Sequence, residues 1–338
     1  MAYKNYDVSG LATYIKQEAE PIIRDVLFGG KLINRVRTQL GVKGAATINI
    51  LDADPTIQAG GCGFDPAATD VLSQRVINAV PLKVNDQICV DNLIGTFGEY
   101  YVKHGANETP DFPFEAQYMA SVAAKLKNKI ETLLFQGDTT SLDDLLKLND
   151  GLLKIADTDL DAANKVSITA GTSIYAGLLQ MVGAFSDEML AKGAEIYVSP
   201  QIHMLLQQEL VNMNYYHYGV EPSDEVFLPG LPVKVVAMYG LKGSLVALAT
   251  YPDNIVYGTD IRDAEEQIRS EYKPFEGVFN ILVKWNAGIN FAFPADVVTG
   301  TFASLPTVGI GNAALNAIAT GVAELADEDH VFKTKEQA

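Results

Sequence analysis

Two glycines near the C-terminal end of the sequence have a spacing that could bind a phosphate. Gly309, Gly311 and Ala314 match the loose G-x-G-x-x-A pattern of dinucleotide-binding turns. Only 24 residues follow Ala314, which is too few for the crossover helix and the further strands of a nucleotide-binding sheet. We interpret the pattern as an ordinary turn, and keep a nucleotide-binding enzyme that uses Gly309–Ala314 as the less favoured functional hypothesis.

An acidic triplet in the middle of the chain could bind a cation. Asp157, Asp159 and Asp161 resemble the opening of a calcium loop, in which alternate residues supply oxygen ligands. Ala162 stands where that loop needs glycine, and Ile168 stands where it needs the final glutamate. We interpret the triplet as a solvated acidic loop, with a weak cation site as the alternative.

The histidines and cysteines have no spacing that is typical of a metal or catalytic site. The four histidines are far apart and none lies in an HExxH pattern: His104, His203, His217 and His330. Cys62 lies among glycines with no neighbouring histidine in sequence to activate it, and Cys89 is the only other cysteine. The sequence therefore predicts no enzymatic activity, no metal and no cofactor.

Composition excludes several classes of protein. Apolar residues make up 48% and charged residues 20% of the chain, which is typical of a globular protein. The net charge of −17 repels phosphate backbones, so a dedicated DNA-binding protein is not indicated. The first 20 residues lack the pattern of a signal peptide. The long uncharged run at 297–323 contains Pro306 and several glycines, so we expect no membrane span.

The N-terminal part of the chain predicts an arm followed by a long hairpin. Residues 1–27 hold one amphipathic stretch, which Gly29 and Gly30 end. Alternating strands at Ala46–Leu51 and Val71–Val80 flank a wide glycine-rich tip. This hairpin has too few apolar residues for a core of its own, so we expect it to lie against something outside its own domain.

Helices come next, beginning with a short candidate at Asp91–Lys103, and strands follow them. The clearest predicted helix, Phe114–Phe135, begins after a proline, ends before a glycine and carries one apolar stripe. Its lysines at 125, 127 and 129 surround more than one face, and we interpret them as solvated surface. We also expect helices at 173–191 and 200–211 around a strand at 195–198. A strand meander follows over 231–298, with one turn at Asn286-Ala287-Gly288. This order predicts an α+β fold.

This order of elements resembles the major capsid proteins of tailed phages, the Hong Kong 97 fold. The segment EAQYMASVAAKLKNKIETLLFQGD is similar to the long spine helix of that family, and EIYVSPQIHMLLQQ is similar to its axial strand and helix. The segments LPGLPVKVVAMYGLKGSLVALATYPDNIVYGTD and VFNILVKWNAGINFAFPADVVTG are similar to its return strands. Together the resemblance covers roughly residues 30–300.

The resemblance implies a division of the chain and a structural function. The implied parts are an N-terminal arm (1–33), an extended loop (34–84), a peripheral domain (85–138 and 251–300), an axial domain (139–250) and a C-terminal extension (301–338). Such subunits form hexamers and pentamers of an icosahedral head around double-stranded DNA, which they hold without sequence-specific contact. An encapsulin-like compartment shell, similar in fold, is the alternative.

Further partners and a location follow from the same resemblance. It implies a homo-oligomer, a separate scaffold protein, a portal and decoration proteins. The chain would be part of the virion, assembled in the host cytoplasm.

Charge is unevenly distributed and suggests how neighbouring subunits meet. Residues 31–50 carry four basic and no acidic residues, namely Lys31, Arg35, Arg37 and Lys43, whereas 138–229 has a net charge of −10. We predict that this basic root of the extended loop contacts acidic surface on a neighbouring subunit. The alternatives are a solvated basic strand and weak contact with packaged DNA. Gly60, Gly61 and Gly63, at the loop tip, complete the predicted intersubunit contacts.

Overall fold

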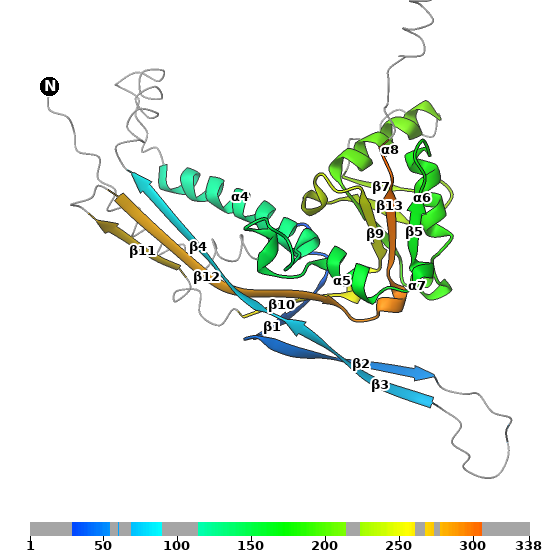
Figure 1. Cartoon of the computed structure of the whole chain (residues 1–338), viewed down its shortest axis with the longest axis horizontal. Coiled ribbons are helices and arrows are strands. Elements are labelled where there is room, and N and C mark those ends of the chain that lie inside the picture. The colour runs from blue at the N-terminus through cyan, green and yellow to red at the C-terminus, as the bar shows by residue number, and fades with distance from the viewer. Residues whose placement is uncertain are drawn as a thin grey trace, which may run out of the picture.

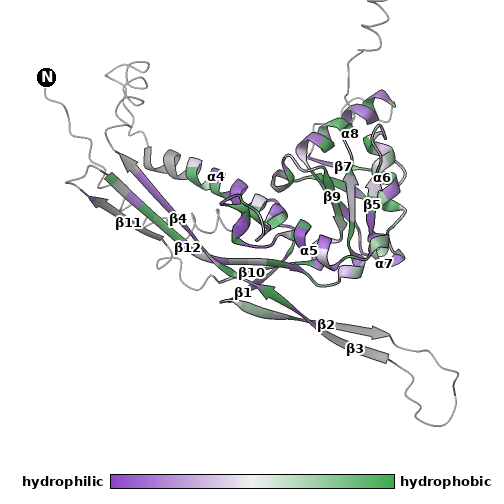
Figure 2. Ribbon diagram, in the orientation of Figure 1, coloured by the Kyte–Doolittle hydropathy of each residue, from purple (hydrophilic) through white to green (hydrophobic). Residues whose placement is uncertain are grey.

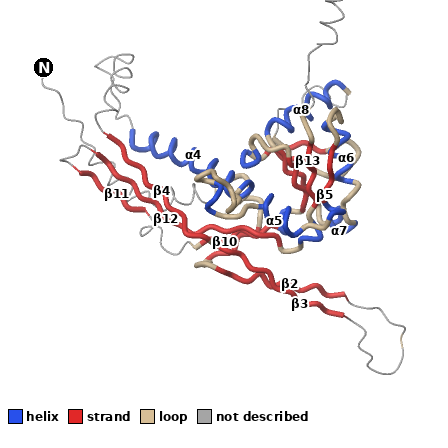
Figure 3. Tube along the Cα trace, viewed as in Figure 1, coloured by secondary structure: helices blue, strands red, loops and turns tan. Residues whose placement is uncertain are grey.

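The computed structural model describes residues 29–54, 60, 69–89, 114–213, 224–260, 268–273 and 278–305. These residues form a long sheet with a helix along one face, a compact α/β unit at one end, and a hairpin that projects from the sheet (Figure 1). Most helices gather in the α/β unit, whereas the long sheet and the hairpin consist of strands (Figure 3). Within the described ranges, no helix has the length and apolar composition that a membrane span requires.

The long sheet has five strands centred on β12 (Val278–Phe291). Its neighbours are β4 (Val80–Cys89) on one edge, and β11 (Ile268–Lys273) and β10 (Ile255–Thr259) on the other, all antiparallel to it. Strand β1 (Arg37–Leu40) adds a parallel edge to β10. Because β12 is 14 residues long, it reaches from the far end of the sheet to the α/β unit.

Helix α4 (Phe114–Gln136) covers one face of this sheet. Its buried stripe includes Leu126, Ile130 and Leu133, which pack in one core with Leu82 and Trp285 of the sheet. Figure 2 shows hydrophilic and hydrophobic residues alternating along α4, as an amphipathic helix requires. The predicted helix is confirmed to within one residue at its C-terminal end.

The α/β unit contains a six-stranded mixed sheet. In spatial order its strands are β5 (Lys165–Ile168), β13 (Val298–Phe302), β9 (Val246–Thr250), β6 (Glu195–Val198), β8 (Lys234–Ala237) and β7 (Glu225–Phe227). The pairs β5–β13 and β6–β8 are parallel, and the others are antiparallel. All four residues of β6 are buried, so this sheet is the centre of a second core.

Three helices pack with the six-stranded sheet: α6 (Ile174–Val182), α7 (Asp187–Ala191) and α8 (Pro200–Asn212). The single helix expected at 173–191 is wrong, because α6 ends at Gly183 and α7 begins at a new N-cap. The hydroxyl of Ser186 accepts a hydrogen bond from the amide of Met189 at 3.2 Å, which satisfies the first turn of α7. Helix α5 (Leu152–Asp159) lies between α4 and the α/β unit.

Short 3-10 helices connect the larger elements. They are η1 (Leu146–Leu148), η2 (Ala162–Asn164), η3 (Tyr239–Leu241), η4 (Pro252–Asn254) and η5 (Pro294–Asp296). The last two carry the chain between the two large sheets, η4 from β9 to β10 and η5 from β12 to β13.

The predicted hairpin is confirmed. Strands β2 (Ala45–Asp54) and β3 (Thr69–Asn78) pair antiparallel over ten positions and form a separate two-stranded sheet. Only Ala79 separates β3 from β4, so the chain passes directly from the hairpin into the long sheet. Figure 1 shows the hairpin projecting away from the side of the long sheet on which α4 lies.

The turn expected at Asn286-Ala287-Gly288 is wrong, because all three residues lie inside β12. Ala287 pairs with Val80, and Gly288 pairs with Gly258. A Cβ atom on Gly288 would lie 2.3 Å from the carbonyl oxygen of Asn78. Gly288 therefore allows the backbone of the hairpin root to pass close to β12, and it does not reverse the chain direction.

The division into an arm, loop, peripheral domain and axial domain remains a prediction. Strand β13, most of which that division assigns to the peripheral part, pairs in the six-stranded sheet of the α/β unit. Most of the predicted arm, the helix expected at 91–103, the extension beyond 305 and the Gly309–Ala314 turn lie outside the described residues.

Candidate assembly surfaces

The first two predicted contact residues, Lys31 and Arg35, lie in a turn that precedes β1. The turn rests on α4, where the buried side chain of Glu131 accepts a hydrogen bond from the amide of Leu32 at 3.1 Å. Lys31 Nζ donates to the carbonyl oxygen of Ala237 at 3.0 Å and lies 3.3 Å from the carboxylate of Asp224. The turn therefore reaches the edge of the six-stranded sheet.

Arg35 makes the strongest ion pairs of this turn. Its Nη1 donates to both carboxylate oxygens of Glu195, at 2.9 and 2.8 Å, and its Nη2 donates to Glu225. The side chain of Arg35 is only 18% exposed and that of Glu195 only 10%. Removing one partner of such a largely buried ion pair strongly destabilises the fold, because the other charge is left buried without its partner. The acidic region that the charge pattern indicated is thus contacted by Lys31 and Arg35 within their own subunit.

Arg37 and Lys43 point elsewhere. Arg37 is exposed on β1, and among the described residues it has neither an ion pair nor a hydrogen-bond partner. Lys43 is 67% exposed and lies 3.9 Å from Asp260. Since their side chains face solvent, Arg37 and Lys43 are the two basic residues of this segment that are available to a neighbour, and intersubunit contact through them stays a prediction.

The hairpin is attached to the subunit at its root. Ile48, Ile50 and Ile77 are buried there in a small cluster with Val256 and Ala292. The root therefore packs against residues that the implied division assigns to the peripheral part of the same chain, and contact of the hairpin with a neighbouring subunit stays a prediction. Burying one such side chain stabilises by about 1.5–3 kcal/mol.

A polar clamp beside this cluster holds the hairpin strand β3. Arg75 Nη2 donates to the Asp159 carboxylate and, at 3.0 Å, to the side-chain oxygen of Asn290. Asn290 returns a hydrogen bond from Nδ2 to the carbonyl oxygen of Val76 at 2.7 Å. Arg75 thereby ties the hairpin both to the end of α5 and to β12. Gly60 is exposed, and Gly61 and Gly63 lie outside the described residues.

Two of the three aspartates of the calcium-loop hypothesis, Asp157 and Asp159, lie in the last turn of α5 and not in a loop, and each forms an ion pair. Asp159 pairs with Arg75, and Asp157 lies 3.1 Å from Lys165. Among the described residues, no three histidine, cysteine or acidic side chains form a group that could hold a metal ion.

Of the four histidines, the structure describes His203, which is buried on α8 and has no hydrogen-bond partner for Nε2. Burial lowers the pKa of this imidazole.

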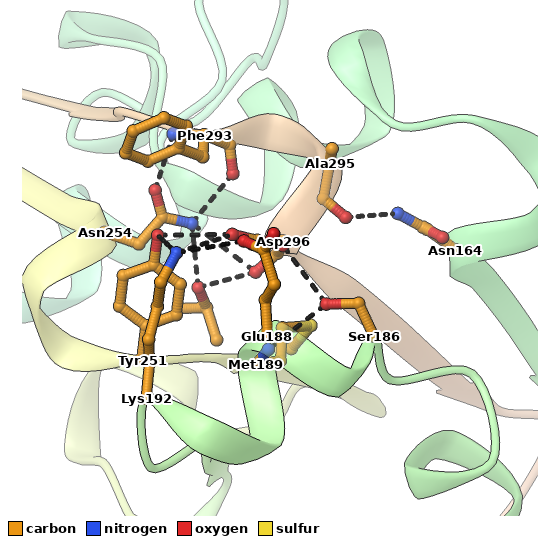
Figure 4. Close-up of polar contacts among 11 residues, drawn as sticks. Asn164, Ser186, Glu188, Met189, Lys192, Tyr251, Asn254, Phe293, Ala295 and Asp296 are labelled. Carbon is orange, nitrogen blue, oxygen red and sulfur yellow. Dashed lines mark hydrogen bonds and ion pairs between the residues drawn. The ribbon is translucent and has the colours of Figure 1, made fainter. Parts of the chain in front are cut away.

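A buried polar cluster that the sequence did not suggest joins the two large sheets at η4 and η5 (Figure 4). Asn254 Nδ2 donates to Thr250 Oγ1 at 2.9 Å and to the carbonyl oxygen of Phe293 at 2.8 Å. Its Oδ1 accepts from the amide of Phe293 at 2.6 Å, while Thr250 donates to the carbonyl oxygen of Asp296 at 2.8 Å. Asn254 is fully buried, so these bonds hold one chain crossing to the other.

Charged side chains extend this cluster to α7. The Asp296 carboxylate accepts from Ser186 at 3.2 Å and from the Tyr251 hydroxyl at 3.3 Å, and Lys192 lies 3.5 Å from it. Partial burial raises the pKa of Tyr251, and the Asp296 charge adds to this. Partial burial opposes the charged form of Lys192, but hydrogen bonds to Glu188 and Tyr251 outweigh it, so its pKa is raised.

The sequence holds a signal that would have found this joint. The segments that cross between the two sheets, at η4 and η5, share one sequence pattern. An aromatic residue is followed by a proline, one further residue and a short polar residue, as YPDN at 251–254 and FPAD at 293–296. Proline suits the first turn of a helix, including a 3-10 helix. Two copies of one such pattern, each following a predicted strand, indicate two equivalent crossings between sheets.

Comparisons with known proteins concern the fold. No protein-family model matches the sequence, and no curated protein matches it. One similar solved structure is the satellite phage P4 procapsid including size determination (Sid) protein. A chain of that structure is 13% identical to this chain, with a TM-score of 0.55. That match covers 84% of this chain and 99% of the P4 chain.

Two further solved structures are similar over most of their length. A capsid chain of an empty GTA particle is 11% identical with a TM-score of 0.51, and the match covers 81% of this chain and 90% of that one. A chain of Microbacterium phage Oxtober96 is 13% identical with a TM-score of 0.50, covering 81% and 91%. The predicted α+β class and the Hong Kong 97 capsid fold are confirmed by these likenesses.

Proposed function

We propose that this chain is the major capsid protein of a tailed bacteriophage and assembles as hexamers and pentamers into an icosahedral head. The observation that carries the proposal is the projecting hairpin, in a chain whose fold is that of capsid subunits. Its two strands pair with each other and with no other described strand. An isolated two-stranded hairpin is marginally stable in water. A neighbouring subunit is the partner that would stabilise it.

The rest of the subunit supports a structural function. Its charged and polar clusters at Arg35, Arg75 and Asn254 have internal partners that connect one element to another. Such clusters fix the relative orientation of the sheets and of the hairpin, which is what a shell of repeated contacts demands. On this proposal the chain has no enzymatic function of its own.

The proposal includes partners and a location. The chain would assemble in the host cytoplasm with a separate scaffold protein, a portal and decoration proteins, and would enclose double-stranded DNA in the virion without reading its sequence. The net charge of −17 fits a container that does not grip DNA over its whole surface.

Electron microscopy of purified material, with and without a co-expressed scaffold protein, tests the proposal. We expect closed shells of uniform diameter, and a matching fast boundary in sedimentation velocity. Nuclease-resistant DNA in shells from infected cells would support the phage function. Shells that hold a protein cargo and no DNA would identify an encapsulin-like compartment instead. A chain that stays monomeric under all these conditions would overturn the proposal.

A further inference from the structure

A basic groove runs along the outer face of α4, where the helix meets η3. The groove has a volume of about 320 Å³ and is lined by three lysines, Lys125, Lys129 and Lys242, together with Asn128, Thr132, Gln136 and Tyr239. The residues of α4 recur at helical spacing, so they belong to one face of the helix. We propose that this groove binds phosphate groups of packaged double-stranded DNA.

The groove is part of the packed structure of the subunit. Gln136 Nε2 donates to the carbonyl oxygens of Gly240 and Lys242, at 2.6 and 3.1 Å, and so holds the η3 segment against the end of α4. A Cβ atom on Gly240 would lie 2.5 Å from the backbone oxygen of Glu131, so only glycine permits this close approach. The position of Lys242 opposite Lys125 and Lys129 is therefore fixed by the fold.

The positive charge of the groove is not neutralised within the described part of the subunit. The lining contains no acidic side chain. Lys125, Lys129 and Lys242 are exposed and form no ion pair among the described residues, and Lys242 only lies over the ring of Tyr239, 5.5 Å from its centroid. Lys127, half-buried on another side of the helix, is not in the lining. The solvated-surface interpretation of this lysine run missed the contribution of Lys242, which is distant in sequence.

The chemistry of the lining favours phosphate over an acidic protein segment. A peptide that docks in a groove needs apolar pockets for anchor side chains, whereas the side chains that line this groove carry three ammonium groups, two amides, a threonine hydroxyl and one tyrosine ring. Lys125 and Lys129 are one turn apart, about 6 Å along the helix. Such an array can follow a charged backbone without reading bases. Binding of this kind is weak and falls with salt, which suits DNA that is held at high concentration.

The inference rests on the proposed function, and it predicts that the α4 side of the long sheet faces the lumen. The opposite side offers a matched control. Lys83 and Lys284 face each other across β4 and β12 and are both exposed. They have no ion pair among the described residues. The variants Lys125→Gln/Lys129→Gln and Lys83→Gln/Lys284→Gln each remove two charges, from opposite sides of the same sheet.

The experiment measures binding of a fluorescent random-sequence duplex to the purified full-length chain between 50 and 200 mM salt. For the groove variant we expect at least a tenfold loss of affinity at 50 mM salt. We also expect the negative slope of log affinity against log salt concentration to become shallower by about 1.8. The control variant should match the wild type. Wild-type binding that is absent, or that both variants reduce equally, would overturn the groove proposal.

Two further measurements separate this inference from the proposed function. Polyglutamate serves as the acidic-protein probe, and if it binds through Lys125 and Lys129 while duplex DNA does not, the DNA proposal is overturned. Shell formation is scored by electron microscopy for all three proteins. Shells without lysine-dependent DNA binding would overturn the groove alone. Lysine-dependent binding by a chain that never assembles would overturn the capsid function while supporting the groove as a phosphate site.

Discussion

The joint between the two sheets and the root of the hairpin are stabilised by different kinds of contact. Both hold one part of the subunit to another. At the joint, Asn254 is fully buried and has side-chain hydrogen bonds to Thr250 and Phe293. At the root, a small isoleucine cluster, the Arg75 clamp and the hydrogen bond from Asn290 to the carbonyl oxygen of Val76 hold the hairpin to the rest of the subunit.

This difference separates what the subunit fixes by itself from what it leaves to assembly. Buried polar networks whose members are all satisfied define one geometry, so the angle between the two sheets is set before assembly. The two hairpin strands pair with each other and with no other described strand, and an isolated two-stranded hairpin is marginally stable in water. On the proposed capsid function, a neighbouring subunit fixes the final position of the hairpin.

The largest expected effect is a contrast between Arg35 and Arg37. Arg35→Glu removes the cation that Glu195 pairs with, leaves Lys234 as the cation beside Glu225 and adds a third carboxylate, so we expect a loss of about 3–5 kcal/mol in unfolding free energy. Arg37→Glu changes an exposed side chain, so its loss should stay within about 0.5 kcal/mol. Urea unfolding followed by the fluorescence of Trp285, the only tryptophan, measures both.

Assembly completes this comparison. If Arg37 contacts a neighbour, the folded Arg37→Glu subunit should form shells more slowly by light scattering, and the wild type should assemble less well as salt rises. Normal assembly of Arg37→Glu with an unchanged salt response would contradict an intersubunit role for this arginine.

The joint gives the next largest effect. Asn254→Ala leaves the buried side chain of Thr250 at the end of β9 and the backbone of Phe293 before η5 without their partner, at a cost of about 2–4 kcal/mol. Asn164→Ala is the matched control, because Asn164 donates to the carbonyl oxygen of Ala295 at the same joint but this hydrogen bond is exposed to solvent. We expect that control to lose less than about 1 kcal/mol. Equal losses in the two variants would show that the buried network does not define the joint.

The hairpin root should respond locally. Ile77 is fully buried and Val76, its neighbour, is 44% exposed. Ile77→Ala should cost about 2–3 kcal/mol and speed proteolytic cleavage between residues 55 and 68, whereas Val76→Ala should do neither. Cleavage that is unchanged in Ile77→Ala would mean that the isoleucine cluster does not hold the hairpin.

The smallest effect is a pH dependence at His203. Burial lowers its folded pKa from 6.5 despite the nearby Asp224 carboxylate, and Lys31 lowers it further. The unfolded imidazole therefore binds a proton at higher pH than the folded one, so stability falls as the pH drops through 6.5. His203→Gln should remove this component, and the difference between variant and wild type from pH 7.5 to 5.5 measures it. Parallel curves would contradict it.

Local signals in the sequence predicted the elements well. The helix at α4 was recognisable because a proline precedes it, a glycine follows it and its apolar residues recur at helical spacing. The hairpin strands were recognisable from their alternation. These signals depend on neighbours along the chain, and they therefore do not need the folded structure.

Contacts between distant segments were not predictable in this way. Gly288 looks like a turn residue, but it is glycine because the hairpin root passes close to it. Arg35 meets Glu195, which is 160 positions away, and Lys242 completes a groove with lysines of α4. The basic and acidic regions were correctly seen as complementary, but charge composition does not say whether the partner lies in the same subunit.

Hydrogen exchange on free subunits and on assembled shells tests the central claim most directly. We predict that amides of β2 and β3 exchange at least tenfold more slowly in shells, because a neighbouring subunit covers them. Amides of β6 and β9 should change little, since both strands are already paired on each side within the subunit. Equal exchange of the hairpin amides in the two states would contradict the account.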